Sequence, residues 1–303
     1  MRLAAVLVAS AFATFTHAQP TFKSGIDLVN FGVTVVDRKG GLITDLTEAD
    51  FEVFEQGKKQ QIRYFVRGDA EAESAPAQHL GLLFDTSGSM EADIKFARTA
   101  AIKFLNSLPE AKDITLVDFD TEVRVARYGQ ADFARLIERI RGRKPDGWTA
   151  LYDALGVFLD GATTLDGQKI LVVYTDGGDT RSHTTFVEIM KLLKASDVTV
   201  YAIGFLENQS TSVRNEQRMR LQQLAEVTGG QAHFPMSVKE LDKFYDKVLQ
   251  EIRARYSFGY VSTDARTDGA WRDVDIKIVR PDAKNLRIRA RKGYFAPYKS
   301  AGS

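Results

Sequence analysis

The middle of the chain alternates short apolar runs with longer stretches in which apolar residues return every three or four positions. The short runs have the length of buried strands, and the longer stretches have the periodicity of amphipathic helices. The predicted strands cover residues 80–84, 114–119, 123–125, 170–175, 198–204 and 232–234. The predicted helices cover residues 90–108, 133–140, 151–159, 186–193, 213–227 and 238–252. This alternation favours an α/β fold with a doubly wound, mostly parallel sheet, and the run 123–125 is expected to be its antiparallel edge.

The two ends of the chain have the period of two that is typical of half-buried strands. These strands are expected at residues 29–35, 51–55 and 62–66, and again at 256–260, 274–278 and 286–288. Neither group has enough strands to form a stable sandwich alone. We therefore expect residues 26–67 and 256–298 to pair in one β-sandwich. The α/β domain, residues 78–255, is then inserted between them after a linker at 68–78.

The first 18 residues have the pattern of a secretory signal peptide. Arg2 is followed by a short apolar core that ends in small residues at Ala18, so the mature chain is expected to begin near Gln19. No later stretch is long and apolar enough to be a membrane span. The chain has no cysteine, which excludes disulfides and a lipid anchor on cysteine. Together these features predict an exported bacterial protein, either periplasmic or secreted.

The overall composition argues against large-scale disorder and against nucleic acid as a partner. Of the 303 residues, 44% are hydrophobic and 27% are charged, which is ordinary for a globular protein. The formal net charge is +1. A surface that binds nucleic acid normally gives its domain a clear basic excess, and this chain has none.

The residues that bear chemistry follow the first strand of the central region. Asp85, Ser87 and Ser89 alternate in the turn between that strand and the next helix, so their oxygen atoms can converge on one point. Asp176 follows another predicted strand, and Thr149 lies where a loop enters a helix. Because the carboxyl ends of parallel strands meet at one edge of a sheet, we expect these side chains to come together there. A donor set made only of oxygen, with carboxylate charge nearby, fits a hard cation.

This arrangement resembles the metal-ion-dependent adhesion site of von Willebrand factor type A domains. The matching positions are, in order, Asp85, Ser87, Ser89, Thr149 and Asp176. The resemblance covers the whole predicted α/β domain and implies a Mg²⁺ ion held directly by the hydroxyls of the two serines and the threonine. It also implies that the two aspartates act mostly through water. The wider layout, with flanking β segments, is similar to secreted bacterial proteins related to type A domains.

Two functions of different classes follow from such an ion. In the first, the chain is a non-enzymatic binding or adhesion protein. Mg²⁺ held mainly by neutral hydroxyls keeps enough charge to capture an Asp or Glu of a protein partner. In the second, the chain is a metal-dependent hydrolase, which needs a general base, and no His or Glu recurs beside the five positions. We favour binding, with Mg²⁺ as the ion and Mn²⁺ or Ca²⁺ as alternatives; the sequence identifies neither the partner nor the oligomeric state.

Two further signals point to other chemistry. Asp118-x-Asp120 resembles the first motif of haloacid-dehalogenase phosphatases, but Glu122 stands where that motif has Thr or Val, and a plain hairpin is favoured. His183 follows the loop that contains Asp176 and could contact the ligand. The alternative for His183 is a solvated residue at the start of a helix, and we favour this alternative.

Overall fold

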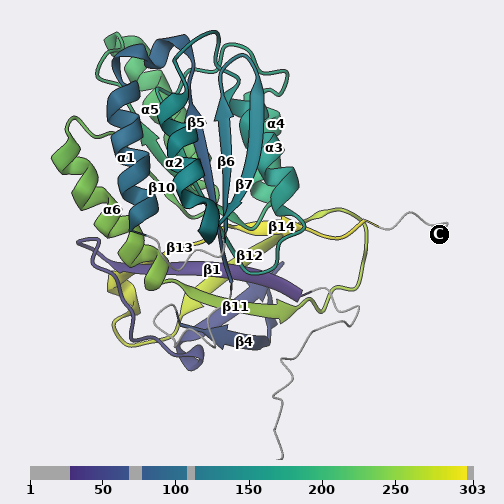
Figure 1. Cartoon of the computed structure of the whole chain (residues 1–303). Helices are drawn as coiled ribbons and strands as arrows, with labels where there is room; N and C mark the ends of the chain where they lie inside the picture. The colour runs from purple at the N-terminus through teal and green to yellow at the C-terminus, as the bar shows by residue number, and fades with distance from the viewer. Residues whose placement is uncertain (1–27, 68–76, 108–112, 299–303) are drawn as a thin grey trace, which may run out of the picture.

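The computed structural model describes residues 28–67, 77–107 and 113–298. Figure 1 shows an α/β domain in the upper part of the view and antiparallel sheets beneath it. The predicted signal segment, residues 1–18, lies outside the described residues, as does most of the predicted linker at 68–78. Among the described helices, none is both long and apolar enough to cross a bilayer.

The α/β domain is built on one sheet, which in the described part of the chain has six strands in the order β10-β9-β8-β5-β6-β7. Their bounds are β5 (Gln78–Asp85), β6 (Asp113–Phe119), β7 (Val123–Gly129), β8 (Gln168–Thr175), β9 (Val198–Gly204) and β10 (Gln231–His233). All neighbours are parallel except β7, which pairs antiparallel with β6 through a hairpin. This confirms the predicted mostly parallel sheet and its antiparallel edge. The loops that follow the adjacent central strands β5 and β8 therefore emerge side by side at the carboxyl edge.

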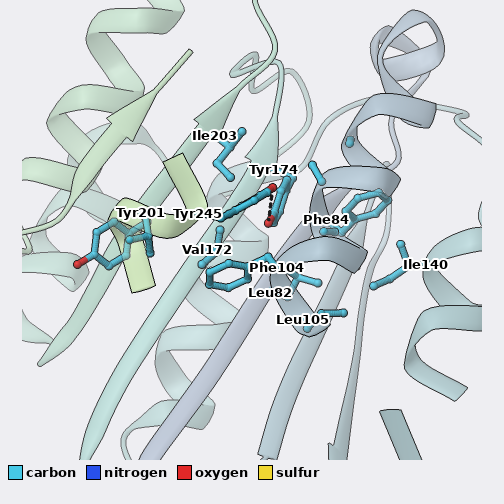
Figure 2. Close-up of a cluster of buried hydrophobic side chains, with 14 of the residues drawn as sticks. Leu82, Phe84, Phe104, Leu105, Ile140, Val172, Tyr174, Tyr201, Ile203 and Tyr245 are labelled. Carbon is cyan, nitrogen blue, oxygen red and sulfur yellow. Dashed lines mark hydrogen bonds between the residues drawn. The ribbon is translucent and has the colours of Figure 1, made fainter. Parts of the chain in front are cut away.

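Helices cover both faces of this sheet, as the sequence periodicity predicts. They are α1 (Ile94–Asn106), α2 (Phe133–Gly142), α3 (Leu151–Ala162), α4 (Phe186–Ala195), α5 (Thr211–Glu226) and α6 (Val238–Arg253). Apolar residues of α1, α2 and α6 pack on one face, and those of α3, α4 and α5 pack on the other. Figure 2 shows the first of these layers, in which the hydroxyl of Tyr245 donates a hydrogen bond of 3.1 Å to that of Tyr174. Neither buried hydroxyl is therefore left unpaired among the apolar side chains.

Two four-stranded antiparallel sheets form the second unit, in the orders β13-β1-β11-β4 and β14-β12-β2-β3. Their strands are β1 (Leu28–Asp37), β2 (Phe51–Glu55), β3 (Lys58–Gln60), β4 (Ile62–Val66), β11 (Tyr256–Val261), β12 (Trp271–Ile278), β13 (Leu286–Arg289) and β14 (Gly293–Phe295). In each sheet a strand from the N-terminal segment pairs with one from the C-terminal segment, β1 with β11 and β2 with β12. The ring centroid of Phe51 in one sheet lies 5.3 Å from that of Tyr256 and 5.6 Å from that of Phe258 in the other. The predicted sandwich, with the α/β domain inserted between its halves, is confirmed.

Three details differ from the sequence prediction. A 3-10 turn, Gly88–Ala92, precedes α1. The backbone N–H groups of Met90 and Asp93 donate to the carbonyls three positions before them, whereas an α-helix bonds four positions back. Residues 58–60 form β3, which was not among the predicted strands, since Gly57 with φ +77° closes a tight hairpin and pairing resumes at once. The short strand β14 was not predicted, and its pairing with β12 over three residues defines it as a strand.

Arginine side chains join the sandwich to the α/β domain. Arg291 donates from Nη1 to the carbonyl of Ser196 at 3.1 Å and from Nη2 to the carbonyl of Asn30 at 2.6 Å. Arg255 is buried and donates to the carbonyl of Gly32 at 2.9 Å. Ser196 lies just before β9, so these bonds fix the domain on the sandwich by the end of the sheet opposite to its carboxyl edge.

A half-buried histidine in β10 is expected to make the fold sensitive to acid. His233 packs on Phe244 with ring centroids 3.7 Å apart, and burial, reinforced by the positive charges of Lys247 and Arg289, lowers its pKa from 6.5 to about 4. The unfolded chain then binds a proton more readily than the folded one, so this contribution to stability is complete above about pH 6.5 and is lost as the pH falls toward 4.

The raised pKa values of Asp85 and Asp176 act in the opposite direction, equally in the wild-type chain and in His233→Gln. We therefore expect the urea midpoint of His233→Gln to rise relative to that of the wild-type chain as the pH falls from 6.5 to 4. His183→Gln changes an exposed histidine and serves as the control, for which no such pH-dependent difference is expected. Equal slopes for the wild-type chain and His233→Gln would contradict this assignment.

Candidate metal centre

The turn after β5 holds three oxygen-bearing side chains close together. Asp85 and Ser87 are fully buried. The Asp85 carboxylate accepts one hydrogen bond at Oδ1 from the backbone N–H of Ser87 (2.9 Å) and another at Oδ2 from Oγ1 of Thr175 (2.6 Å). The hydroxyl oxygens of Ser87 and Ser89 lie 3.1 Å apart. The structure thus brings Asp85 together with both predicted serines, and the aspartate is held in one orientation.

Asp176 reaches the same place from the end of β8, which the bond between Thr175 and Asp85 holds against the end of β5. The Asp176 Oδ2 atom accepts a hydrogen bond of 3.1 Å from Nε2 of Gln209, whereas its Oδ1 atom is buried and has no hydrogen-bond partner. The next residue, Gly177, has φ +85°, and a Cβ there would lie 2.9 Å from a side-chain atom of α5. Glycine is therefore required for the chain to turn directly after Asp176.

Thr149 belongs to the loop before α3, which hydrogen bonds tie to both of the other loops. The N–H of Gly88 donates to the carbonyl of Gly147 at 3.0 Å. On the other side, the N–H of Thr149 donates to Oγ1 of Thr180 at 3.0 Å, and the N–H of Thr180 donates to the carbonyl of Thr149 at 2.9 Å. Thr149 is buried. The three loops that carry the five predicted positions are therefore joined by hydrogen bonds at the carboxyl edge of the sheet.

The two aspartates repel each other in a buried position unless a cation joins them. Burial, with a smaller contribution from the charge of Asp176, raises the pKa of Asp85 to about 7. Burial also raises the pKa of Asp176, against the opposing effect of the Ser89 hydroxyl. Two carboxylates, a close pair of hydroxyls and an unpartnered carboxylate oxygen form a donor set that suits a hard divalent cation. The residues present therefore fit the ion that the resemblance implies.

Donors of the kind that zinc prefers are not gathered elsewhere in the part of the chain that the structure describes. Within residues 28–67, 77–107 and 113–298, no group of three or more His, Cys, Asp or Glu side chains is placed to hold a metal ion. The donor set at the sheet edge is rich in hydroxyls and has no nitrogen or sulfur ligand among its predicted members. This chemistry favours Mg²⁺, Mn²⁺ or Ca²⁺ over zinc.

His183 is held by Asp153 near the start of α4. Its backbone N–H donates to Oδ2 of Asp153 at 2.9 Å, and its Nδ1 lies 3.2 Å from the same oxygen. The His183 side chain is 86% exposed. This placement agrees with a solvated residue at a helix start, and contact of His183 with a ligand stays a prediction.

The other aspartate motif is engaged in ion pairs. Asp118 is buried, and its carboxylate lies 2.8 Å from Arg124, 2.6 Å from Arg139 and 3.0 Å from Arg143. Asp120 is paired with Arg124 at 2.5 Å. Three guanidinium groups neutralise Asp118 and bind α2 to the edge of the sheet. The hairpin between β6 and β7 and these ion pairs agree with the structural interpretation of this motif.

Three residues that position the candidate ligands were not singled out from the sequence. They are Thr175, Thr180 and Gln209, which are hydrogen-bonded to Asp85, Thr149 and Asp176 respectively. Their roles depend on contacts in space that no local pattern encodes. The available signal was their place at or just after the carboxyl ends of β8 and β9, where ligand sites of α/β sheets lie.

The sheet with helices on both faces and polar loops at its carboxyl edge defines an α/β domain of the ligand-binding type. Comparison with family models matches residues 79–252, more than half of the chain, to the von Willebrand factor type A domain. The chain belongs to this family. The comparison with curated proteins found no match.

Solved structures to which the chain is similar include three from bacteria. Von Willebrand factor type A from Catenulispora acidiphila is 12% identical, with 84% of this chain and 76% of that chain covered and a TM-score of 0.47. The vWF domain of the type V pili tip protein Mfa5 from Porphyromonas gingivalis is 13% identical, with 64% and 99% covered and a TM-score of 0.46. The pilus adhesin SpaC from Lactobacillus rhamnosus GG is 11% identical, with 82% and 48% covered and a TM-score of 0.47. Likenesses this distant carry no functional argument.

Proposed function

We propose that the chain is an exported, non-enzymatic binding protein that holds Mg²⁺ at the carboxyl edge of its α/β sheet. It uses the ion to capture an Asp or Glu side chain of a protein partner. The observation that carries the proposal is the buried, unpartnered Oδ1 atom of Asp176, in a site that also contains the buried carboxylate of Asp85. A bound cation stabilises that oxygen and relieves the repulsion between the two carboxylates.

The residues of the edge divide this task among them. Ser87, Ser89 and Thr149 would bind the ion through their hydroxyls, and the two aspartates would act mostly through water. Thr175 keeps Asp85 oriented by its hydrogen bond. When bound, Mg²⁺ supplies a coordination position at which a carboxylate can replace a water molecule. Because the proposed direct ligands are neutral, the site retains the positive charge that attracts an acidic partner.

Export rests on the sequence of residues 1–18, which has the order of a signal peptide: a charged start, an apolar core and a small-residue end. The lack of cysteine suits a fold that is stable without disulfides in an oxidising compartment. A protein placed outside the cytoplasm can reach partners on the cell envelope or beyond it.

Titration of the full chain with Mg²⁺ in a calorimeter tests the metal part of the proposal. Ser87→Ala and Thr149→Ala each remove one proposed hydroxyl ligand, and each should weaken Mg²⁺ binding by at least about tenfold. Ser210→Ala is the matched control, because this exposed serine at the start of α5 makes no capping bond with its side chain. Unchanged affinity in both ligand variants would contradict the proposal.

The capture step is tested by pull-down from the native cell envelope with Mg²⁺ and with a chelator. A partner that depends on the proposed site should be lost with chelator and recovered with Mg²⁺ or Mn²⁺. Replacing the critical Asp or Glu of that partner by Asn or Gln should also abolish binding. Turnover of phosphoesters or peptides that is lost in Ser87→Ala would instead support the hydrolase alternative.

A further inference from the structure

Trp148 places a large apolar side chain in solvent beside the proposed metal centre. It is 64% exposed, whereas the next residue, Thr149, is only 4% exposed. An indole ring has a large apolar area, and its burial against another molecule is favourable. Trp148 thus has the exposure of a contact residue and adjoins a proposed ligand of the ion.

The backbone that carries Trp148 is fixed. The Trp148 N–H donates to Oγ1 of Thr121 at 2.9 Å, and the carbonyl of Gly147 accepts from the N–H of Gly88 at 3.0 Å. Gly147 has φ +69°, and a Cβ there would lie 2.4 Å from Oγ1 of Thr121, so this position requires glycine. Because the main chain is already ordered, a partner that packs on the indole need not order this loop first.

We propose that Trp148 determines the specificity of the site by packing against an aromatic or aliphatic side chain next to the Asp or Glu that the partner presents. The inference rests on the proposed function, because it assumes that a carboxylate is captured beside Thr149. The Cα atoms of Trp148 and Thr149 are separated by about 3.8 Å, as are those of any two consecutive residues in the partner. The partner residue next to the captured carboxylate is therefore offset along its backbone by the same spacing as Trp148 from Thr149.

An apolar neighbour suits this position better than a cationic one. A Lys or Arg could stack on the indole through a cation–π contact. At this place, however, it would lie close to the bound divalent ion, which repels it. An apolar or aromatic side chain meets no such repulsion, and tryptophan is prominent among the residues that dominate binding energy at protein interfaces.

A library of heptapeptides displayed on phage tests the proposal with the full chain. Phage are bound in Mg²⁺ and eluted with chelator. We expect enrichment of Asp or Glu with an aromatic or aliphatic residue at an adjacent position. On the Trp148→Ala chain, enrichment of the acidic residue should persist, and enrichment of its apolar neighbour should be lost.

The most enriched peptide is then made synthetically, and calorimetry measures its affinity for each variant. Trp148→Ala should bind it at least about tenfold more weakly, whereas Trp148→Phe should retain most of the affinity. Mg²⁺ affinity should be equal in all three chains. The sequence has two tryptophans, so in a Trp271→Phe background the emission of Trp148 alone should shift to the blue on peptide binding.

The failure of this inference can be told apart from the failure of the proposed function. No acidic enrichment, or elution indifferent to chelator, would contradict metal-dependent capture itself. Enrichment of acidic residues with random or cationic neighbours would overturn the role of Trp148 and leave metal-dependent capture supported. The same apolar neighbours enriched on both the wild-type chain and Trp148→Ala would have the same meaning. An unshifted emission on binding would likewise overturn that role.

Discussion

Asp85→Ala is expected to abolish Mg²⁺ binding by the full chain without unfolding it. The substitution removes a full negative charge beside the cation in a buried turn, where charge interactions are weakly screened. It also leaves the hydroxyl of Thr175 and the N–H of Ser87 without their acceptor, at a cost of about 1–3 kcal/mol for each unpaired group. Relief of repulsion from Asp176 offsets part of that cost. Asp85→Asn keeps an oxygen acceptor and should preserve the fold more fully.

Thermal unfolding with Mg²⁺ and with chelator checks this prediction, because a ligand that binds only the folded state raises the melting temperature. The wild-type chain should gain stability with Mg²⁺, and both Asp85 variants should not. Asp153→Asn is the matched control, since it removes a carboxylate at the same end of the domain that bonds to His183 and Thr184. A shift with Mg²⁺ that persists in Asp85→Asn would exclude this aspartate from the metal site.

Deletion of residues 256–303 is expected to destroy the sandwich and make the chain aggregate. The deletion removes β11, which lies between β1 and β4. It takes away Tyr256, Phe258 and Tyr260, all fully buried, and truncating even one buried aromatic side chain costs about 3–5 kcal/mol. The strands that remain would expose unpaired edges, which template aggregation.

Solubility and differential scanning calorimetry of the deleted chain check this, with a chain that ends at Tyr298 as the control. The control should behave like the full chain. The excised fragment 78–255 should still fold, because both apolar layers of the α/β domain consist of residues within it. If the deleted chain melts as cooperatively as the full one, residues 26–67 and 256–298 do not form one folding unit.

The fold could be predicted where a periodic pattern is long enough to show which face is buried. The alternating residues of β1 and the helical spacing of α1 are such patterns. The pairing of the two flanking segments could be predicted because neither has enough strands to form a stable sandwich alone. The strands β3 and β14 have three residues each and lie outside the strand–helix alternation that marked the equally short β10, so they were missed.

The part of the candidate site that could be predicted consists of the oxygen-bearing residues at strand ends. Asp85 and Ser87 stand in a turn whose position the strand pattern defines, and the structure places them together. The hydrogen bond from Gln209 to Asp176 joins loops 33 positions apart, and nothing in either segment announces it. The exposure of Trp148 was equally hidden, because tryptophan is highly buried on average and no local pattern marks this one as exposed.

The insertion of the α/β domain has a mechanical consequence. The chain passes between the two units twice, once before β5 and once between α6 and β11, and Arg291 and Arg255 tie them further. A domain joined by one connection can swivel about it, whereas two connections with cross-bonds resist torsion. A pull applied at the carboxyl edge of the sheet is shared between both covalent paths into the sandwich. The two connections and the arginine hydrogen bonds therefore hold the carboxyl edge at a fixed angle to the sandwich.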